Sequence, residues 1–526
     1  MLIYFVLVPI LIAVFLYLLP SFKVAKAIAA LIQVALLGAA LHLFFLTQDT
    51  LVVIHAGNYT SFLGIILQAD RLASIFVMLT VFVFLCVTVY SFHDQTSRLY
   101  WFLLFTLEGA LIGLFLTRDL FNIFVLAEVS SVVAAVFLMY NRNNRSMYDG
   151  MVYLMVNTVV MQFYLLGLAY IYMLTGVLDM GYATAAIASL DRSQLVLPYT
   201  LVMVAIAAKC GLLPLFTFLP KVHSIPRAPA SVAAILSGLQ VKSGLYLFLR
   251  FRDVFGGIDM REFFLIIGIA TAIFGVILAL GQSDIKRMLA YSTIAQVGLI
   301  LVGLNLNHLY SYIGSIYHMV GHTVAKAALF LSAGIVIQRY KTSEVTEIRG
   351  VFRQMPIVGT AITLAILGIT GAPFFSGNIS KYFMMAQTGL HTYALMTLIN
   401  LGTIAVFIKF SMILFGKPPK DMQREDPVKQ VSVLFLGVLC LIGGIFGVTL
   451  INLIFGVSFS IGISAYIGKL PVLLGSWVVG YLIVRYPVKG NTRLYAIGRL
   501  DINFRGICVS IGGLFALMLI VVGFLT

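Results

Sequence analysis

Apolar runs of bilayer length follow one another along nearly the whole chain, and this succession limits the folds open to it. A hydrocarbon core about 30 Å thick needs about 20 apolar residues per helix. Because backbone groups inside lipid must hydrogen-bond within their own segment, the runs predict helices. The runs lie at about 2–20, 27–47, 72–92, 99–116, 120–140, 150–175, 195–220, 228–249, 262–281, 288–304, 309–337, 355–386, 391–416, 430–454, 466–484 and 506–526. We therefore expect an all-α polytopic membrane protein with about 14–16 transmembrane helices.

Composition agrees with a membrane location. Only 10% of the 526 residues are charged, whereas a soluble domain carries about 25%, so the charges are too few to cover a soluble surface of this size. The first apolar run lacks a basic leading region and a small-residue cleavage site, which predicts a first span and not a signal peptide. The stretch 456–469 is too short to cross a bilayer and predicts a loop or a re-entrant piece.

The distribution of positive residues predicts an orientation. The loops after odd-numbered helices contain 22 of the 34 Lys and Arg residues. The loops after even-numbered helices contain seven, which are Arg71, Arg118, Arg192, Arg250, Arg252, Arg261 and Lys469. Because Lys and Arg favour cytoplasmic loops, we expect the odd loops in the cytoplasm and both termini outside the cell (inner) membrane. The net charge of +15 is explained by these loops, so no nucleic-acid partner is expected. The mixed-charge loops at 339–354 and 417–430 predict short surface helices.

The chain offers no sign of a cofactor, a metal or catalytic chemistry of its own. None of its loops is long enough for a soluble catalytic domain, and no glycine-rich phosphate loop or CxxC pattern occurs. The four cysteines, Cys86, Cys210, Cys440 and Cys508, lie in apolar runs without metal-ligand spacing and are predicted to be small core residues.

Ionisable residues inside the apolar runs are the strongest functional signal. An ionised group at mid-bilayer costs several kcal/mol, so such residues face protein or water. The candidates are Glu108, Glu128, Lys209, Lys242, His318, His322, Lys326 and Lys381. Glu108 fits a structural hydrogen-bonding role and an accessory functional role equally well. Lys409, near a predicted helix end, is expected to extend toward the headgroups.

The segment YHMVGHTVAKAAL places His318, His322 and Lys326 four residues apart. Residues with this spacing share one helix face, and the three span about 12 Å along the axis. One or two waters can bridge each gap. Histidine titrates near neutral pH, and a desolvated lysine loses much of its proton affinity. The face therefore predicts a hydrated ladder of groups that load and release protons.

Two predicted helices contain breaks close to a buried lysine. Pro214 follows Lys209 in KCGLLP, and Pro373 precedes Lys381 in GAPFFSGNISK. Proline removes a backbone donor, and membranes tolerate the freed backbone only beside protein or water. The seventh and twelfth helices cross the bilayer in opposite senses, so the paired breaks indicate two inverted repeats of five helices.

At these motifs the chain resembles the antiporter-like proton-channel subunits of respiratory complex I, Mrp-type cation/proton antiporters and membrane-bound hydrogenases. The matching stretches are KCGLLPLFTFLP (209–220), RAPASVAAILSGLQVKSGLY (227–246), DIKRMLAYSTIAQVG (284–298), HTVAKAALFLSAG (322–334) and SGNISK (376–381). The resemblance implies that Glu128 pairs with Lys209, that Lys242 is central, that His322 and Lys326 continue the path, and that Lys381 ends it. His318, one turn earlier, is expected to assist.

The resemblance also implies an organisation and leaves the function partly open. We expect N-terminal helices in 1–98, five-helix repeats in 99–250 and 262–416, and a C-terminal extension in 417–526. The chain departs from the family pattern at Phe218, Lys221 and Ser237. The leading hypothesis is a subunit of a multisubunit complex that translocates protons, alone or in exchange for sodium, and that a redox reaction drives in some relatives. The alternatives are a non-pumping scaffold subunit and a transporter of an inorganic anion such as bicarbonate.

Overall fold

The computed structural model describes the chain except residues 20–21, 59–63, 217, 224–227, 419–425, 463, 465–467, 469, 489, 499–501 and 526. Fourteen of its described helices are long and apolar enough to cross a membrane, and Leu2–Leu18 and Pro356–Thr370 are shorter apolar helices. This confirms the prediction of a polytopic all-α membrane protein. Each of the 16 predicted runs coincides with at least one of the described helices.

The first half of the chain runs from the N-terminal helices through the first set of buried bases. Its elements are α1 (Leu2–Leu18), α2 (Phe22–Leu46), β1 (Val52–His55), a 3₁₀ turn η1 (Ala56–Asn58), β2 (Ile66–Ala69), α3 (Arg71–Tyr90), α4 (Arg98–Leu116), α5 (Leu120–Leu138), α6 (Asn144–Thr175), α7 (Met180–Ile187), α8 (Arg192–Cys210), α9 (Phe218–His223), α10 (Ala230–Ile235), the π-helix η2 (Leu236–Gln240) and α11 (Val241–Val254). Strands β1 and β2 pair antiparallel, with Val52 opposite Ala69.

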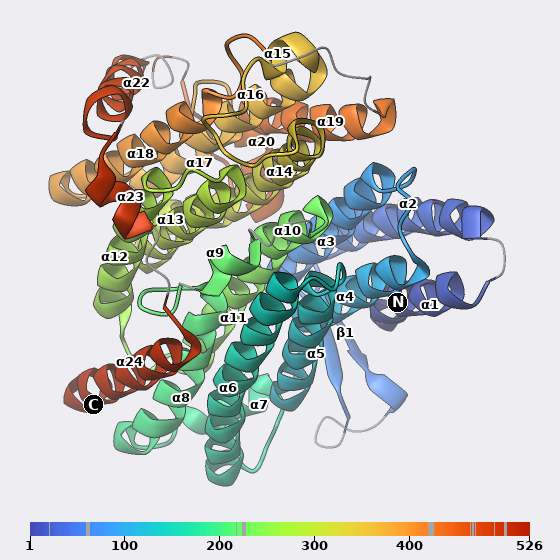
Figure 1. Cartoon of the computed structure of the whole chain (residues 1–526). Helices are drawn as coiled ribbons and strands as arrows, with labels where there is room; N and C mark the ends of the chain where they lie inside the picture. The colour runs from blue at the N-terminus through green and yellow to red at the C-terminus, as the bar shows by residue number, and fades with distance from the viewer. Residues whose placement is uncertain are drawn as a thin grey trace.

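The second half continues the bundle, as Figure 1 shows. Its elements are α12 (Arg261–Leu280), α13 (Ile285–Asn305), α14 (Leu309–Tyr340), α15 (Val351–Gln354), α16 (Pro356–Thr370), α17 (Ser376–Met385), α18 (Leu390–Ser411), α19 (Pro427–Ile445), α20 (Gly447–Phe455), α22 (Leu470–Ile483), the π-helix η3 (Val484–Val488), α23 (Thr492–Gly498) and α24 (Phe504–Leu525).

The two halves repeat the same local features in the same order. Asp119 caps α5 by accepting a hydrogen bond from the Asn122 amide, and Asp284 caps α13 in the same way from Arg287. Helices α6 and α14 both contain 32 residues. Helices α8 and α16 both end at a glycine with positive φ, Gly211 (67°) and Gly371 (82°), a conformation that glycine adopts without a steric penalty. The division into two five-helix repeats stays a prediction, and these parallels favour it.

Both proline-containing breaks are present, and a third interruption was not predicted. Helix α8 ends four residues before Pro214, and α16 ends three residues before Pro373. The eighth run is interrupted by η2, directly before Lys242. A π-turn widens a helix by one residue per turn and is frequent at functional sites. The runs that contain Lys209, Lys242 and Lys381 therefore all depart from regular α-helix.

The apolar core falls into two large clusters that follow the halves. One cluster contains mostly residues of α1–α11 together with α24, and the other mostly residues of α12–α19. Tight helix contacts need glycine: a Cβ on Gly275 would lie 2.6 Å from the Ala295 amide nitrogen, between α12 and α13. Such close approach of backbones through small residues is typical of helix packing in membranes.

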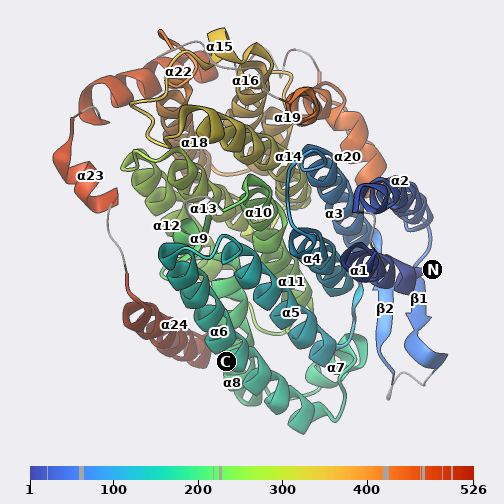
Figure 2. The same ribbon diagram turned by 45° about the vertical axis from the view of Figure 1, so that its right-hand side comes forward.

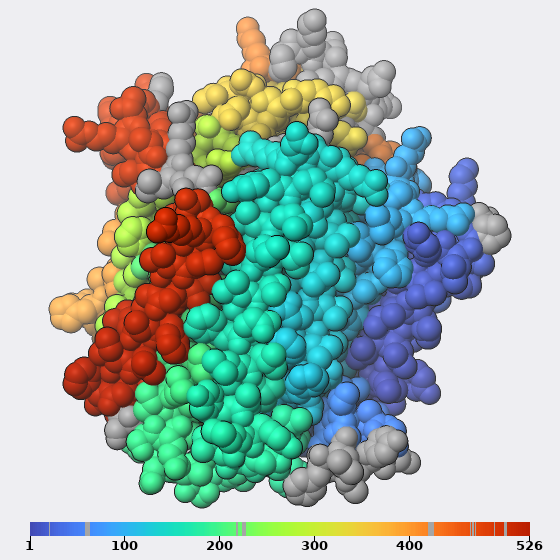
Figure 3. All heavy atoms as spheres, turned by 60° about the horizontal axis from the view of Figure 1, so that its bottom comes forward, coloured from blue at the N-terminus to red at the C-terminus, as the bar shows by residue number. Residues whose placement is uncertain are grey.

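The C-terminal extension reaches across the bundle. Helix α22 packs on α18, α23 on α12, and α24 on α8 and α6. Figure 2 shows α23 between α22 and α24 along one edge of the molecule, and Figure 3 shows α24 lying over the surface of α6 and α8. Gln282 donates a 2.6 Å hydrogen bond to the Gly498 carbonyl, which ties α23 to the turn after α12.

Several sequence expectations need correction. Residues 339–354 do not form one surface helix, because α14 continues to Tyr340 and only Val351–Gln354 is helical. Of the loop at 417–430, residues 419–425 lie outside the described residues. Lys409 does not extend toward the headgroups: it is buried, and its Nζ donates to the carbonyls of Leu280 and Gln282. The β1–β2 hairpin and α7 were not predicted, because both are too short to produce an apolar run.

Candidate functional site

Lys209 lies in the last turn of α8, and its ammonium points at α5. Its Nζ donates to the Ala127 carbonyl at 3.0 Å and to Ser131 Oγ at 2.9 Å. Glu128, on the same turn of α5, lies close enough to Lys209 to interact electrostatically. The two side chains do not form a direct ion pair in the described structure, and Glu128 Oε1 has no hydrogen-bond partner there. The pairing that the resemblance implies is thus open in this conformation.

Lys242 is fully buried just after the π-helix. Its Nζ donates a 2.6 Å hydrogen bond to the Ser237 carbonyl, which the π-turn leaves available. The Ser237 and Thr293 hydroxyls are hydrogen-bonded at 2.7 Å, which joins η2 to α13. On the other side, Gln240 donates to Ser130 of α5 at 3.2 Å. The π-turn therefore holds Lys242 between the two halves of the chain.

Lys326 repeats the arrangement of Lys209 in the second half. Its Nζ donates to the Leu289 carbonyl and to Ser292 Oγ, both on α13. Ser292 precedes Thr293, which contacts the turn of Lys242. Lys242 also lies close enough to Lys326 and to His322 to interact with both electrostatically. One hydrogen-bonded group thus connects the central lysine to the second half.

The two histidines of α14 differ in their contacts. His318 is hydrogen-bonded through Nδ1 to Ser380 Oγ at 2.8 Å and through Nε2 to Gln296 Oε1 at 2.9 Å. His322 is equally buried, yet neither ring nitrogen has a partner among the described residues. The two ring centres are 6.2 Å apart. The space beside them, lined by Ser376 and Gly377 among others, is too narrow for a water molecule in this conformation.

Lys381 ends the series on α17, after the second break. Its Nζ donates to the Ile369 carbonyl and to Asn400 Oδ1, both at 2.6 Å. Ser380, its neighbour in the chain, contacts His318. The break between α16 and α17 exposes the Ile369 carbonyl and lets Lys381 fold back on it. The last group therefore consists of two hydrogen-bonded pairs, His318 with Ser380 and Lys381 with Asn400, at consecutive positions of α17.

Glu108 lies apart from this series, in the N-terminal helices. It is fully buried on α4 and accepts a hydrogen bond from Gln33 Nε2 of α2, while its Oε1 has no described partner. Lys209, Lys242, His318, Lys326 and Lys381 each take part in a group of buried polar contacts, and His322 lies beside His318 without a described partner. Glu108 lies outside these groups.

Sequence reasoning missed the neutral partners of the bases. Every buried lysine of the series donates to a carbonyl or to a Ser or Asn oxygen. Buried hydroxyls and amides also supply the links between bases, through Ser237, Thr293, Gln240, Gln296 and Ser380. The available signal was a polar side chain inside an apolar run, such as Gln240 two residues before Lys242.

Two cavities open at opposite ends of the same three helical segments, α10–α11, α13 and α14. One, of about 680 Å³, is lined by Ser231, Lys286 and Gln338 among others. The other, of about 760 Å³, is lined by Arg252, Asn305 and Tyr312 among others. Lys242 and Lys326 lie between these two ends of the helices. The two cavities thus mark possible water contacts on both faces.

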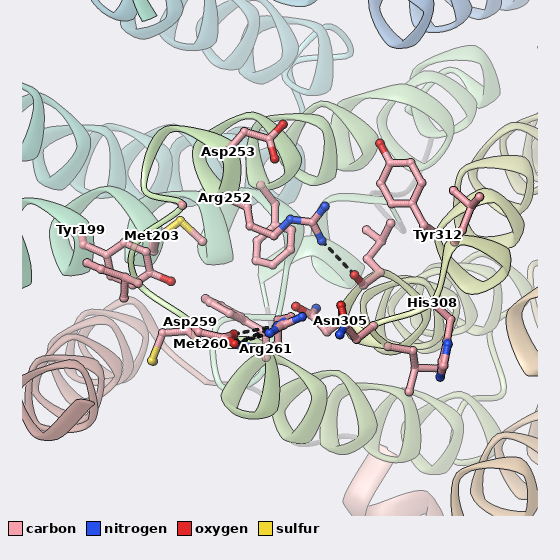
Figure 4. Close-up of a pocket in the computed structure, with 18 residues that line it drawn as sticks. Tyr199, Met203, Arg252, Asp253, Asp259, Met260, Arg261, Asn305, His308 and Tyr312 are labelled. Atoms are coloured by element: carbon pink, nitrogen blue, oxygen red, sulfur yellow. Dashed lines mark hydrogen bonds and ion pairs between the residues drawn. The ribbon is translucent and has the colours of Figure 1, made fainter. Parts of the chain in front are cut away.

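Figure 4 shows the second cavity. Arg252 donates a 2.9 Å hydrogen bond to the Leu304 carbonyl, and its guanidinium lies 5.8 Å from the ring centre of Tyr312. Asp259 pairs with Arg261 at the mouth, and this hydrogen bond lowers the pKa of Asp259 below its ordinary value. Nearer the centre, the rings of Phe248 and Phe264 pack at 4.9 Å. These two rings line the cavity on the side of Lys242 with apolar surface.

Comparison with known proteins agrees with this architecture. The chain is 28% identical over 410 residues to a Na(+)/H(+) antiporter subunit of Alkalihalophilus pseudofirmus, and the match covers 75% of this chain and 82% of that protein. It is 29% identical over 420 residues to an NADH-quinone oxidoreductase subunit of Desulforudis audaxviator, covering 74% and 83%. A chain of the Mrp complex from Dietzia sp. DQ12-45-1b shares the fold, with a TM-score of 0.80, 22% identity and coverage of 90% and 99%.

A family model gives the assignment. Residues 117–409, more than half of the chain, match the transmembrane region of the NADH:quinone oxidoreductase/Mrp antiporter family. This range contains all the bases of the series from Lys209 to Lys381, and it excludes the N-terminal helices and the C-terminal extension. The chain therefore belongs to the NADH:quinone oxidoreductase/Mrp antiporter family of membrane proteins.

Proposed function

We propose that this chain translocates protons along the series Glu128, Lys209, Lys242, Lys326, His322, His318 and Lys381, as a membrane subunit of an antiporter or respiratory-type complex. One observation carries the proposal. Four lysines are buried in the middle of the bundle, and each donates only to neutral oxygens. Buried ammonium groups without a counter-charge are costly. Because release of a proton removes this cost, we expect each of these lysines to gain and lose a proton during transport.

The hydrogen bonds divide the series into three groups with gaps between them. The first runs from Lys209 through Ser131 and the neighbouring Ser130 to Gln240. The second runs from Lys242 through Ser237 and Thr293 to the Leu289 carbonyl, which also accepts from Lys326. The third contains His318 with Ser380 and, at the next position of α17, Lys381 with Asn400. His322 stands between the second and third groups with both nitrogens free of described partners.

A gap lets one group control the next electrostatically. At an effective dielectric of about 20, two unit charges about 6 Å apart interact by about 3 kcal/mol, which changes a pKa by about two. When Glu128 closes on Lys209, the positive field at Lys242 weakens and Lys242 takes up a proton. When the pair opens, as in this structure, Lys242 passes its proton toward Lys326 and His322.

The relatives and the positive loops support a proposed assembly and orientation. Relatives named as subunits of Na(+)/H(+) antiporters and of NADH-quinone oxidoreductases favour a multisubunit complex in the cell membrane. The face with Lys286 and Lys341 would be cytoplasmic, and the N-terminus would lie outside. Protons would enter from the Lys286 cavity. Exchange for sodium would use a partner subunit, because the series offers ammonium and imidazole groups and few oxygen ligands.

Replacement of the central lysine tests this function. In the complex purified with its native partners and reconstituted in vesicles, Lys242→Met keeps the aliphatic stem and removes the ammonium. We expect proton transport to fall by more than about tenfold, the scale of losing an acid–base group. Lys409→Met is the matched control, because Lys409 is buried but bonded to the end of α12. Wild-type transport by Lys242→Met would contradict the proposal.

A further inference from the structure

A small cavity surrounds Lys381, and one of its walls comes from the C-terminal extension. The cavity has a volume of about 70 Å³. Its lining residues come from the break before α17 (Pro373), from α17 (Asn378, Lys381), from α18 (Asn400) and from α22 (Ser476). Helix α22 lies outside the family-matched range of 117–409. The extension therefore lines the same cavity as the last base of the series.

The contacts of Lys381 leave it able to bind water in this cavity. Its Nζ donates to the Ile369 carbonyl and to Asn400 Oδ1, and an ammonium group has three N–H donors. A buried water needs about 10–15 Å³ of cavity and polar partners, so about 70 Å³ is enough for several waters. Hydroxyl and amide groups of Asn378, Thr397 and Ser476 supply such partners.

Helix α22 is held against α18 so that one side faces Lys381 and the other sides face outward. Gly480 packs on Ile404 and Ala405 of α18. A Cβ at position 480 would touch both residues, so the absence of a side chain lets α22 approach α18 closely. Ser476 lies one turn before Gly480 and borders the cavity. Leu474, Val478 and Val479 are exposed on the remaining surface of α22. Figure 1 shows α22 beside α18, at the side of the bundle remote from α1 and α2.

We propose that α22 closes a water-filled terminal chamber in which Lys381 releases its proton, and that Ser476 positions the accepting water. In this step the N–H bond of the Lys381 ammonium breaks, an O–H bond forms on water, and Lys381 becomes a neutral amine. The positive charge leaves on the hydronium ion. This inference rests on the proposed function and adds a role for the extension, which keeps lipid tails away from Lys381.

Thiol labelling in the full chain tests whether the chamber contains water. In a Cys508→Ala background, Ser476→Cys should react with a charged, membrane-impermeant methanethiosulfonate, since a thiolate forms only in contact with water. Val479→Cys, on the exposed surface of the same helix, should not react because it faces lipid. Labelled Ser476→Cys should lose most of its proton transport. An unreactive Ser476→Cys, or full transport after labelling, would overturn the proposal.

A bulky substitution tests the same chamber in the reconstituted complex. Ser476→Trp places an indole in the cavity and should lower proton transport by more than about tenfold, whereas Val479→Trp should transport as wild type. Ser476→Thr retains the hydroxyl and should retain transport. Equal transport by Ser476→Trp and wild type would refute the chamber. If the chamber is refuted but Lys242→Met abolishes transport in the same experiment, the proposed function stands without the chamber. If Lys242→Met transports normally, the proposed function itself fails.

Discussion

His318 and His322 lie one turn apart on α14, but their contacts differ. This difference indicates a structural role for His318 and a transport role for His322. Both are buried. His318 satisfies both ring nitrogens through Ser380 and Gln296, whereas His322 satisfies neither among the described residues. An unsatisfied buried polar group costs about 1–3 kcal/mol. A group kept at such a cost is expected to act in some other state, here as the carrier between Lys326 and His318.

Paired substitutions measure this difference. His322→Leu removes two unpartnered polar atoms, so the thermal midpoint of the purified complex should stay the same or rise, while proton transport falls strongly. His318→Leu leaves Ser380 and Gln296 without their partner and should destabilise the protein by about 1–3 kcal/mol. Thermal melting in detergent and vesicle transport give the two quantities. A His322→Leu variant that melts much earlier than wild type would mean that this histidine has structural partners.

At this scale the sequence predicted the bases better than their partners. The four-residue spacing of His318, His322 and Lys326 is sufficient to place them on one helix face. Their hydrogen-bond partners come from other helices, α13 and α17. These partners are 22, 34 and 62 positions away in the sequence. Only packing decides which serine or glutamine meets which base. For the same reason the open Glu128–Lys209 pair could not be foreseen from a single sequence.

Among the elements, the interrupted helices are what make the backbone available to the bases. The Ser237 carbonyl in η2 accepts from Lys242, and the Ile369 carbonyl at the α16–α17 break accepts from Lys381. In a regular helix both carbonyls would bond within the helix. Proline and glycine predicted the breaks after α8 and α16. The π-helix adds one residue to a turn without any required residue type, so its residues LSGLQ offered no comparable signal.

The α16–α17 break depends on one close backbone contact. A Cβ on Gly377 would lie 2.0 Å from the Gly368 carbonyl oxygen, a distance at which the two helices must separate. We expect Gly377→Ala to lower the stability by about 1–3 kcal/mol and to reduce transport, because Lys381 follows on the same helix. Gly389→Ala is the matched control, since nothing lies within 4 Å of its added methyl.

Melting and transport of these two variants decide the point. If Gly377→Ala shifts the thermal midpoint and Gly389→Ala does not, the contact holds the break in place. If both variants melt like wild type, the break tolerates separation of α16 and α17, and Lys381 must be positioned by Asn400 alone.

Across the whole molecule, the bases are distributed over two halves with separate apolar cores. Lys209 is hydrogen-bonded within the first half, and Lys326 and Lys381 are hydrogen-bonded within the second. Lys242 belongs to the first half, yet the turn before it contacts Thr293 of the second. Length and hydropathy predicted the helices, and the two prolines predicted the breaks after α8 and α16. They could not predict how α22, α23 and α24 wrap the bundle, because an apolar helix fits many neighbours equally well.

The cavity near Lys286, on the face rich in positive loops, is where the proposed function places proton uptake. Three hydroxyls line it in a hydrogen-bonded row: Ser91 with Tyr100 at 2.8 Å, and Tyr100 with Ser231 at 2.7 Å. Ser231 begins the helix that leads through η2 to Lys242. A row of hydroxyls passes a proton by exchanging donor and acceptor roles along it, and a tyrosine can take both roles.

Removing one hydroxyl from this row tests the route through the whole molecule. Tyr100→Phe keeps the buried ring and its packing against Phe137. The complex should therefore assemble, and its unfolding free energy should fall by about 1–3 kcal/mol because the hydrogen bonds to Ser91 and Ser231 are both lost. Its proton transport should fall several-fold, because the row is cut between the cavity and Ser231. Tyr140→Phe is the control: it loses hydrogen bonds to Ser97 outside the cavity lining and should transport normally. Equal transport by the two variants would place proton uptake elsewhere on this face, and the series beginning at Lys242 would then need a different connection to water.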